Sequence, residues 1–171
     1  MGTIINKPAL IEIRDGKIAM VRTKGQDVFF MPGGSLEPGE NDHQGLIREC
    51  REEISIEIDE GSIEYYDTFE AQAHGKPEGT IVRMNCYTAK YEGEFKPGRK
   101  SDTEESEIEE IALLDYEDWE RVGLTAKYIF DDLREKGLIT GSIESKEHFM
   151  EAARKRRGER QRERELGGKR L

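Results

Sequence analysis

Three glutamates near the middle of the chain are spaced so that one helix would present them together. With Leu46 set to zero on a helical wheel, Glu52, Glu49 and Glu53 fall at about 240°, 300° and 340°. They lie beside an apolar face that comprises Leu46, Ile47, Cys50 and Ile54. Because carboxylates at this spacing repel one another, we expect a cation to bind among them.

The residue types around these glutamates favour a metal site. Carboxylate oxygens are ligands that Mg²⁺ and Mn²⁺ prefer. The alternative is a solvated acidic face, in which Lys would alternate with Glu. Here Arg48 and Arg51 flank the acidic arc instead of filling it. Gly33 and Gly34 lie upstream, where a backbone without side chains can approach a ligand closely.

The same residues form a spaced motif. Gly34 is followed after five residues by Glu40, and seven residues later by the run RECREEISI, which begins at Arg48. This pattern resembles the Nudix box, GX5EX7REUXEEXGU, in which U is aliphatic. Ser55 stands at the second box glycine, and Cys50 stands at an aliphatic position.

The resemblance implies an activity and a fold. Nudix hydrolases use water and divalent cations to cleave a nucleoside diphosphate linked to another moiety. Their fold is an α/β/α sandwich with a mixed β-sheet, which we expect over residues 1–140. Residues 141–171 lie outside the resemblance, and we expect them to form a basic helical extension or a disordered tail.

The resemblance also implies roles for individual residues. By their positions in the box, Glu49, Glu52 and Glu53 are the metal-binding glutamates, and the Gly34 carbonyl is an additional candidate ligand. Glu40 matches the first box glutamate, which in the family supports the site. Arg48 matches the arginine that orients the carboxylates in the family. Mg²⁺ or Mn²⁺ is the implied cofactor.

The general base is less closely defined, because the family takes it from the box helix in some members and from a later loop in others. Glu53 is our first candidate. The acidic loop 102–110 offers Glu104, Glu105 and Glu107 as a base or a further ligand, although such a charge run is more often a solvated loop. We expect Gly33 to contact substrate. Arg22, at the end of a predicted strand, could bind substrate phosphate or be an exposed strand-end arginine.

Local patterns predict the elements that would position these residues. Asp15-Gly16 is typical of a type I′ turn and therefore predicts a β-hairpin. Asn41 with Gln44 predicts the start of the box helix, which ends near Ser55. The other predicted elements are strands over 9–14, 17–23, 28–31, 63–69, 80–91 and 108–114, and a helix from Thr125 to a terminal Gly137.

Composition excludes several classes of protein. Charged residues make up 37% of the 171 residues, and no apolar run approaches the length of a membrane span. Two cysteines without a CxxC pair cannot build a disulfide framework or a four-cysteine zinc site. We therefore expect a cytoplasmic protein that does not enter a membrane.

The sequence narrows the partners and the substrate only to classes of molecule. A small nucleotide is the expected partner, and the sequence also allows a homodimer. Residues 151–171 carry nine Lys or Arg against four Asp or Glu, which favours weak polyanion binding by the tail. Nucleoside triphosphates, oxidised or not, and related nucleotides are all open as substrates. The alternative function is a catalytically silent Nudix-like module that senses nucleotides or binds RNA.

Overall fold

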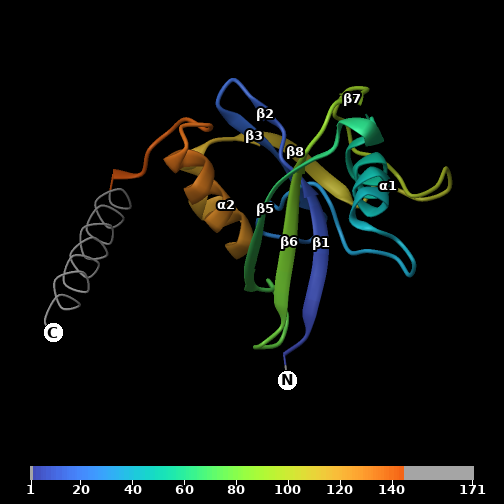
Figure 1. Ribbon diagram of the computed structural model, residues 1–171, viewed down its shortest axis with the longest axis horizontal. Coiled ribbons are helices and arrows are strands. Elements are labelled where there is room, and N and C mark those ends of the chain that lie inside the picture. Colours follow the sequence, from blue (N-terminus) through green and yellow to red (C-terminus); the bar gives the residue numbers. More distant parts are fainter. Residues whose placement is uncertain (1, 145–171) are drawn as a thin grey trace, which may run out of the picture. The chain divides into compact units, whose positions relative to one another are not determined.

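Two three-stranded sheets lie at the centre of the computed structural model, which describes residues 2–144 (Figure 1). The first, sheet A, has the order β1-β6-β5 and comprises β1 (Ile4–Leu10), β6 (Ile81–Thr88) and β5 (Glu64–Gln72). Strand β1 runs parallel to β6, whereas β5 runs antiparallel to it. The sheet is therefore mixed, as predicted.

The second sheet, sheet B, contains the predicted hairpin. It comprises β2 (Ile13–Arg14), β3 (Lys17–Thr23) and β8 (Ile108–Leu114). Asp15 and Gly16 have φ of 50° and 74°, as a type I′ turn requires. The single strand expected over 9–14 is wrong, because its first residues belong to β1 of sheet A. The Ile11 N–H still donates to the Tyr87 carbonyl of β6, and the chain then crosses to sheet B.

The segment from Phe29 to Gly33 connects the two sheets. Phe30 pairs with Val21 of β3, and Gly33 pairs with Ala9 of β1, each through an isolated bridge. A continuous strand over 28–31 is therefore wrong: within that range Phe30 bridges to sheet B and Phe29 bridges to Val122, and the bridge to sheet A comes from Gly33. This arrangement holds the Gly33-Gly34 backbone at the junction of the sheets.

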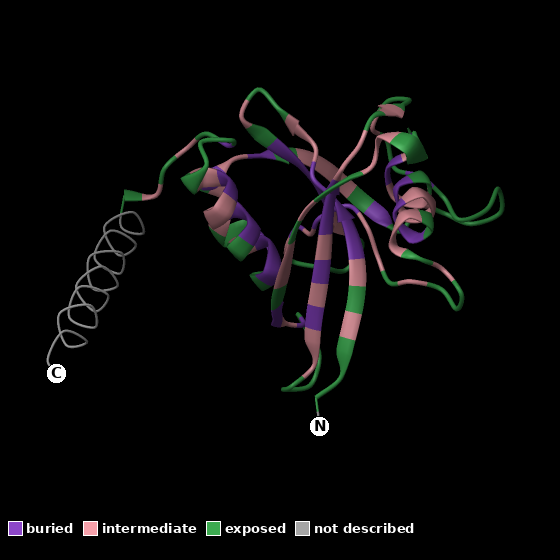
Figure 2. Ribbon diagram, in the orientation of Figure 1, coloured by how far each residue is buried: buried purple, intermediate pink, exposed green. Residues whose placement is uncertain are grey.

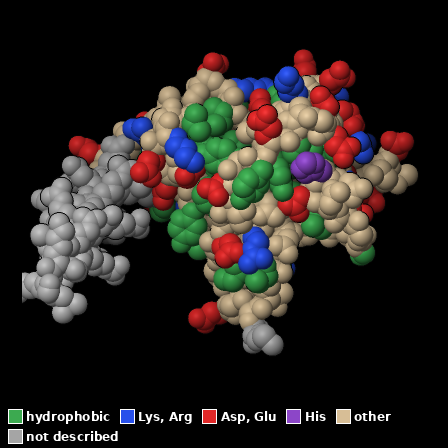
Figure 3. Space-filling model, viewed as in Figure 1, with side chains coloured by type: hydrophobic (Ala, Val, Ile, Leu, Met, Phe, Trp, Pro, Cys, Tyr) green, Lys and Arg blue, Asp and Glu red, His purple; other side chains and the backbone are tan. Residues whose placement is uncertain are grey.

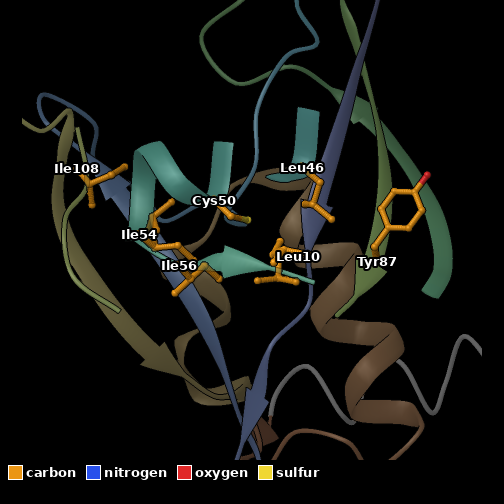
Figure 4. Packing of buried hydrophobic residues seen from close by; sticks show 9 residues of the cluster. Leu10, Leu46, Cys50, Ile54, Ile56, Tyr87 and Ile108 are labelled. Atoms are coloured by element: carbon orange, nitrogen blue, oxygen red, sulfur yellow. The ribbon is translucent and has the colours of Figure 1, made fainter. Parts of the chain in front are cut away.

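Helix α1 (Asp42–Ile54) covers one side of the strands. It contacts β1, β8 and β4 (Glu57–Ile58). Strand β4 pairs with β7 (Tyr91–Glu92). A short 3₁₀ turn at Glu60–Ser62 follows β4. The strand predicted over 80–91 is thus divided between β6 and β7. The apolar face of α1 is buried with residues of the strands, as Figure 4 shows for Leu10, Leu46, Cys50, Ile54, Ile56, Tyr87 and Ile108.

Helix α2 (Leu124–Glu135) follows a 3₁₀ helix at Tyr116–Arg121 and packs against β5. Its buried residues include Ala126, Ile129, Phe130 and Leu133, which are the face predicted from their spacing. Gly137 follows the helix with φ of 72°. Figures 1 and 2 show α1 and α2 on opposite sides of the strands, with buried residues facing inward. The fold is the expected α/β/α sandwich.

Of the extension predicted over residues 141–171, residues 145–171 lie outside the described residues. The boundary near residue 140, the homodimer and polyanion binding stay predictions. Within residues 2–144, none of the helices has both the length and the apolar character needed to cross a bilayer.

Candidate active site

Helix α1 carries the predicted site because both of its ends are well defined. The Asn41 side chain accepts from the Gln44 N–H at 2.9 Å, and the Gln44 side chain accepts from the Asn41 N–H at 3.0 Å. This capping box satisfies two backbone donors at the helix start. At the other end, Ser55 has φ of 60°, and its N–H donates to the Arg51 carbonyl at 3.2 Å. Ser55 therefore adopts the left-handed conformation that glycine adopts most readily.

Arg48 connects the carboxylates on and before the helix. Its guanidinium donates twice to Glu40, at 2.6 and 2.9 Å, and once each to Glu49 at 2.8 Å and Glu52 at 3.3 Å. It also donates to the Ser35 carbonyl at 3.0 Å. The hydrogen bonds from Arg48 and from the Glu37 N–H lower the pKa of Glu40 to about 2. Arg48 thus lies where the expected orienting arginine would lie.

Glu53 is held by the glycine-containing segment that joins the sheets. The Gly33 N–H donates to the Glu53 carboxylate at 2.9 Å. Burial raises the pKa of Glu53 to about 8, and nearby Glu49 and Glu107 add to that increase, whereas the Gly33 N–H and the Lys7 ammonium oppose it. Burial and the neighbouring carboxylates therefore disfavour the ionised form of Glu53, and a positive charge bound nearby would favour it.

Gly34 lies against a second carboxylate. A Cβ atom at position 34 would come within 2.5 Å of the nearer Glu49 oxygen, so only glycine fits without a shift. Burial raises the pKa of Glu49, and the hydrogen bond from Arg48 opposes this increase. The structure therefore brings Glu49, Glu53 and the Gly33-Gly34 backbone together, as the sequence predicts.

The chemistry of these donors fits a divalent cation. Glu49, Glu52 and Glu53 provide hard oxygen atoms on one rigid helix, and Glu49 and Glu53 are disfavoured as anions by their surroundings. Within residues 2–144, however, no three His, Cys, Asp or Glu side chains are grouped closely enough to hold a metal ion as they stand. Arg48 holds one oxygen each of Glu49 and Glu52, so a cation bound by these glutamates would compete with Arg48 for them.

Two of the three loop candidates reach the glutamates. Glu105 and Glu107 line a small cleft together with Glu49, Glu52 and Glu53, and Glu104 does not line it. Lys100, which sequence reasoning missed, lines the same cleft and donates to Glu107 at 3.0 Å. Only its position next to the acidic loop could have indicated from the sequence that Lys100 lies near the glutamates.

Arg22 forms ion pairs with carboxylates outside the glutamate cluster of α1. It donates to Glu109 at 2.7 Å and to Glu110 at 3.1 Å, both at the start of β8. Phosphate binding by Arg22 would require these ion pairs to be exchanged for the substrate, so this role stays a prediction.

A larger cavity opens beside Glu53. Its volume is about 270 Å³, and Gly33, Gly34 and Glu53 form part of its wall. The rest of the lining is mainly apolar and comes from sheets A and B, Phe30, Met31 and the start of α2. It also includes the polar residues Gln26, His74 and Lys76. Lys7 also lines the cavity, which could not be expected from the sequence because no strand was predicted to begin before residue 9. The cavity therefore places an apolar pocket next to the carboxylates.

Comparison with known proteins identifies the family. The family model of the NUDIX domain matches residues 8–133. The chain belongs to the Nudix family. A curated relative from Escherichia coli strain K12, named CTP pyrophosphohydrolase, is 38% identical over 83 residues, which are 46% of this chain and 56% of that relative. The chain thus matches just over half the length of this Nudix relative.

Solved structures of other Nudix proteins share the fold. A NUDIX hydrolase from Nitrosomonas europaea aligns with a TM-score of 0.60 and 19% identity, over 80% of this chain and 92% of that one. The MutT protein from Bacillus halodurans aligns with a TM-score of 0.55 and 19% identity, over 74% and 80%. At these identities the likeness supports the Nudix fold and does not extend to a substrate.

Proposed function

We propose that this protein is a Mg²⁺- or Mn²⁺-dependent hydrolase that cleaves the diphosphate linkage of a nucleoside triphosphate or a related nucleotide. The observation that carries the proposal is the position of Glu53. It accepts a hydrogen bond from Gly33 at 2.9 Å and lines the 270 Å³ cavity. A nucleotide whose nucleoside part fills this cavity would therefore present its phosphates to the glutamates of α1.

The cluster supplies the groups that diphosphate hydrolysis needs. Glu49, Glu52 and Glu53 would hold the cation, and Arg48 would restrain Glu49 and Glu52 while the site is empty of substrate. A bound cation would neutralise charge on phosphoryl oxygens and acidify a water molecule. Glu53 is the first candidate to accept the proton of the attacking water, because it lies at the boundary between the carboxylate cluster and the cavity.

The cation is especially important for this chain because of its overall charge. The net charge is −10, and Figure 3 shows many Asp and Glu side chains on the face in view. A polyanionic nucleotide approaches such a surface against electrostatic repulsion. Metal ions and local cationic side chains must therefore supply most of the attraction for phosphate.

CTP is the first substrate to test, because the relative from Escherichia coli is named CTP pyrophosphohydrolase. The matching region covers about half of that relative, so other nucleotides belong in the same assay. The panel consists of CTP, UTP, GTP, 8-oxo-dGTP, ADP-ribose and a nucleotide sugar, each with Mg²⁺ and again with Mn²⁺. Chromatography of the products identifies which phosphate bond is cleaved.

Two variants give the assay its control. Glu53→Gln removes a charge from the cluster, whereas Glu57→Gln removes one from an exposed ion pair with Arg51 just beyond the helix. We expect hydrolysis of at least one nucleotide, lost in Glu53→Gln and retained in Glu57→Gln. Binding of nucleotides without hydrolysis of any would favour the silent sensing module instead.

A further inference from the structure

Lys7 lines the 270 Å³ cavity together with apolar neighbours. In the parallel register of sheet A, Lys7 is opposite Met84 and Ile5 is opposite Val82, and all four residues line the cavity. Paired residues of neighbouring strands project to the same face of a sheet. The Lys7 side chain therefore lies on the cavity side of sheet A, beside apolar residues over which its stem can pass.

The ammonium group of Lys7 has no fixed partner. Over residues 2–144, no hydrogen bond or ion pair holds its Nζ, whereas Arg48 is paired with Glu40 and Lys100 with Glu107. Lys7 is half-buried at the cavity and its ammonium has no protein partner among these residues, so it is available to an anion that enters the cavity. Such an arrangement is expected where the partner is a ligand.

Lys7 also lies close enough to the carboxylate cluster to act on it. Burial is the largest influence on the pKa of Glu53 and raises it, and the Lys7 ammonium lowers it. Both residues line the cavity along with Gly33 and Gly34. Lys7 thus stands at the junction between the apolar part of the cavity and the glutamates.

The chemistry of a nucleotide defines what occupies that junction. If the nucleoside fills the apolar cavity and the metal-bound diphosphate lies at the glutamates, the group between them is the α-phosphate. We infer that Lys7 binds the α-phosphate of the substrate and thereby fixes how deeply the nucleotide enters the cavity. This inference rests on the proposed function. An ammonium on a flexible stem suits a phosphate as a compact point charge.

Lys7→Met tests the inference because it keeps the length of the stem and removes the charge. We expect its KM for CTP, or for whichever nucleotide of the panel the wild type hydrolyses best, to rise by about 10-fold or more. Lys7→Arg should recover part of the loss. Lys90→Met is the matched control, since Lys90 is exposed and lines neither cavity, and its KM should stay within about 2-fold of wild type.

Inhibition by fragments of the substrate separates α-phosphate binding from other roles. For CTP the fragments are CMP, cytidine and pyrophosphate. In Lys7→Met the inhibition constant for CMP should rise about as much as KM, while those for cytidine and pyrophosphate stay unchanged. Calorimetric titration of CMP with Mg²⁺ gives the same comparison without turnover, and the thermal midpoint of each variant confirms that it is folded.

Three results would overturn the inference. Unchanged KM and unchanged CMP affinity in Lys7→Met would remove Lys7 from the substrate site, even if the wild type is an active hydrolase. Equal losses for cytidine and CMP would assign Lys7 to packing of the cavity wall. A changed pH profile of kcat with unchanged KM would make Lys7 only a counter-ion of Glu53. Absence of hydrolysis and of CMP binding in the wild type would instead contradict the proposed function itself.

Discussion

The Gly33 N–H donates to the Glu53 carboxylate over 2.9 Å, which joins the segment between the two sheets to the last turn of helix α1. This contact fixes the carboxylate at the wall of the cavity. Gly33 has φ of 142°, and a Cβ there would lie 2.2 Å from the Pro8 carbonyl oxygen of β1. The glycine is therefore required both for its conformation and for the close approach of the strands.

Glu53→Gln should lower kcat by at least about 100-fold while the protein stays folded. The amide oxygen of glutamine can still accept from the Gly33 N–H, so the contact between helix and segment is retained. What is lost is the charge that binds metal and accepts a proton. Steady-state kinetics checks the loss, with thermal unfolding as the test of folding. A near-normal kcat would move the chemistry away from Glu53.

Gly34→Ala should lower kcat by about 10-fold or more with little change in stability. The added methyl group would lie within 2.5 Å of a Glu49 oxygen and displace that carboxylate. Gly61→Ala is the matched control, because the nearest atom to a Cβ at position 61 is 3.6 Å away. If both variants had the same kinetics, the closeness of Gly34 to Glu49 would have no role in catalysis.

Ser55→Gly should stabilise the protein by about 0.5 to 1 kcal/mol. Ser55 has φ of 60°, a backbone conformation that is higher in energy for a residue with a Cβ atom than for glycine. The greater conformational entropy that glycine loses on folding offsets part of this gain. Denaturant unfolding measures the difference, and Ser55→Ala is the control that keeps a Cβ and should give no gain. A loss of stability in Ser55→Gly would show that the serine side chain compensates for its backbone.

Among the three acidic loop residues, Glu107→Gln should reduce kcat by about 10-fold, and Glu104→Gln and Glu105→Gln should stay within about 2-fold of wild type. Glu107 lines the cleft of the glutamates and acts on Glu53 electrostatically. The Glu105 side chain reaches the same cleft but is 92% exposed. Three neutral variants would assign the whole loop to solvent.

Short-range patterns predicted the helix of the site well. The start at Asn41 and the end at Ser55 depend on capping and backbone preferences of nearby residues, and the apolar spacing identified the buried face. The roles of the glutamates came from the motif resemblance. The resemblance also led us to expect that these glutamates lie close to Gly34. Helical periodicity alone could not predict this, because it does not give the distance between helix α1 and the segment that contains Gly34.

Features that depend on strand pairing were not predictable in the same way. Lys7 reaches the cavity because β1 pairs in parallel with β6, which is far away in sequence, and no local pattern marks that pairing. The ion pairs of Arg22 with Glu109 and Glu110 likewise follow from the β3–β8 register. The segment at 28–31 was expected as a strand because its residues are apolar, but only Phe29 and Phe30 form bridges, to Val122 and to Val21 of β3.

Removal and restoration of metal is the most direct test of the account. The wild-type protein is treated with a chelator, exchanged into metal-free buffer and assayed on the nucleotide that it hydrolyses best, before and after Mg²⁺ or Mn²⁺ is added back. We expect hydrolysis to fall to background and to recover with either ion in the wild type, and not to recover in Glu53→Gln. Full hydrolysis after chelation would contradict the assignment of Glu49, Glu52 and Glu53 as the ligands of a catalytic cation.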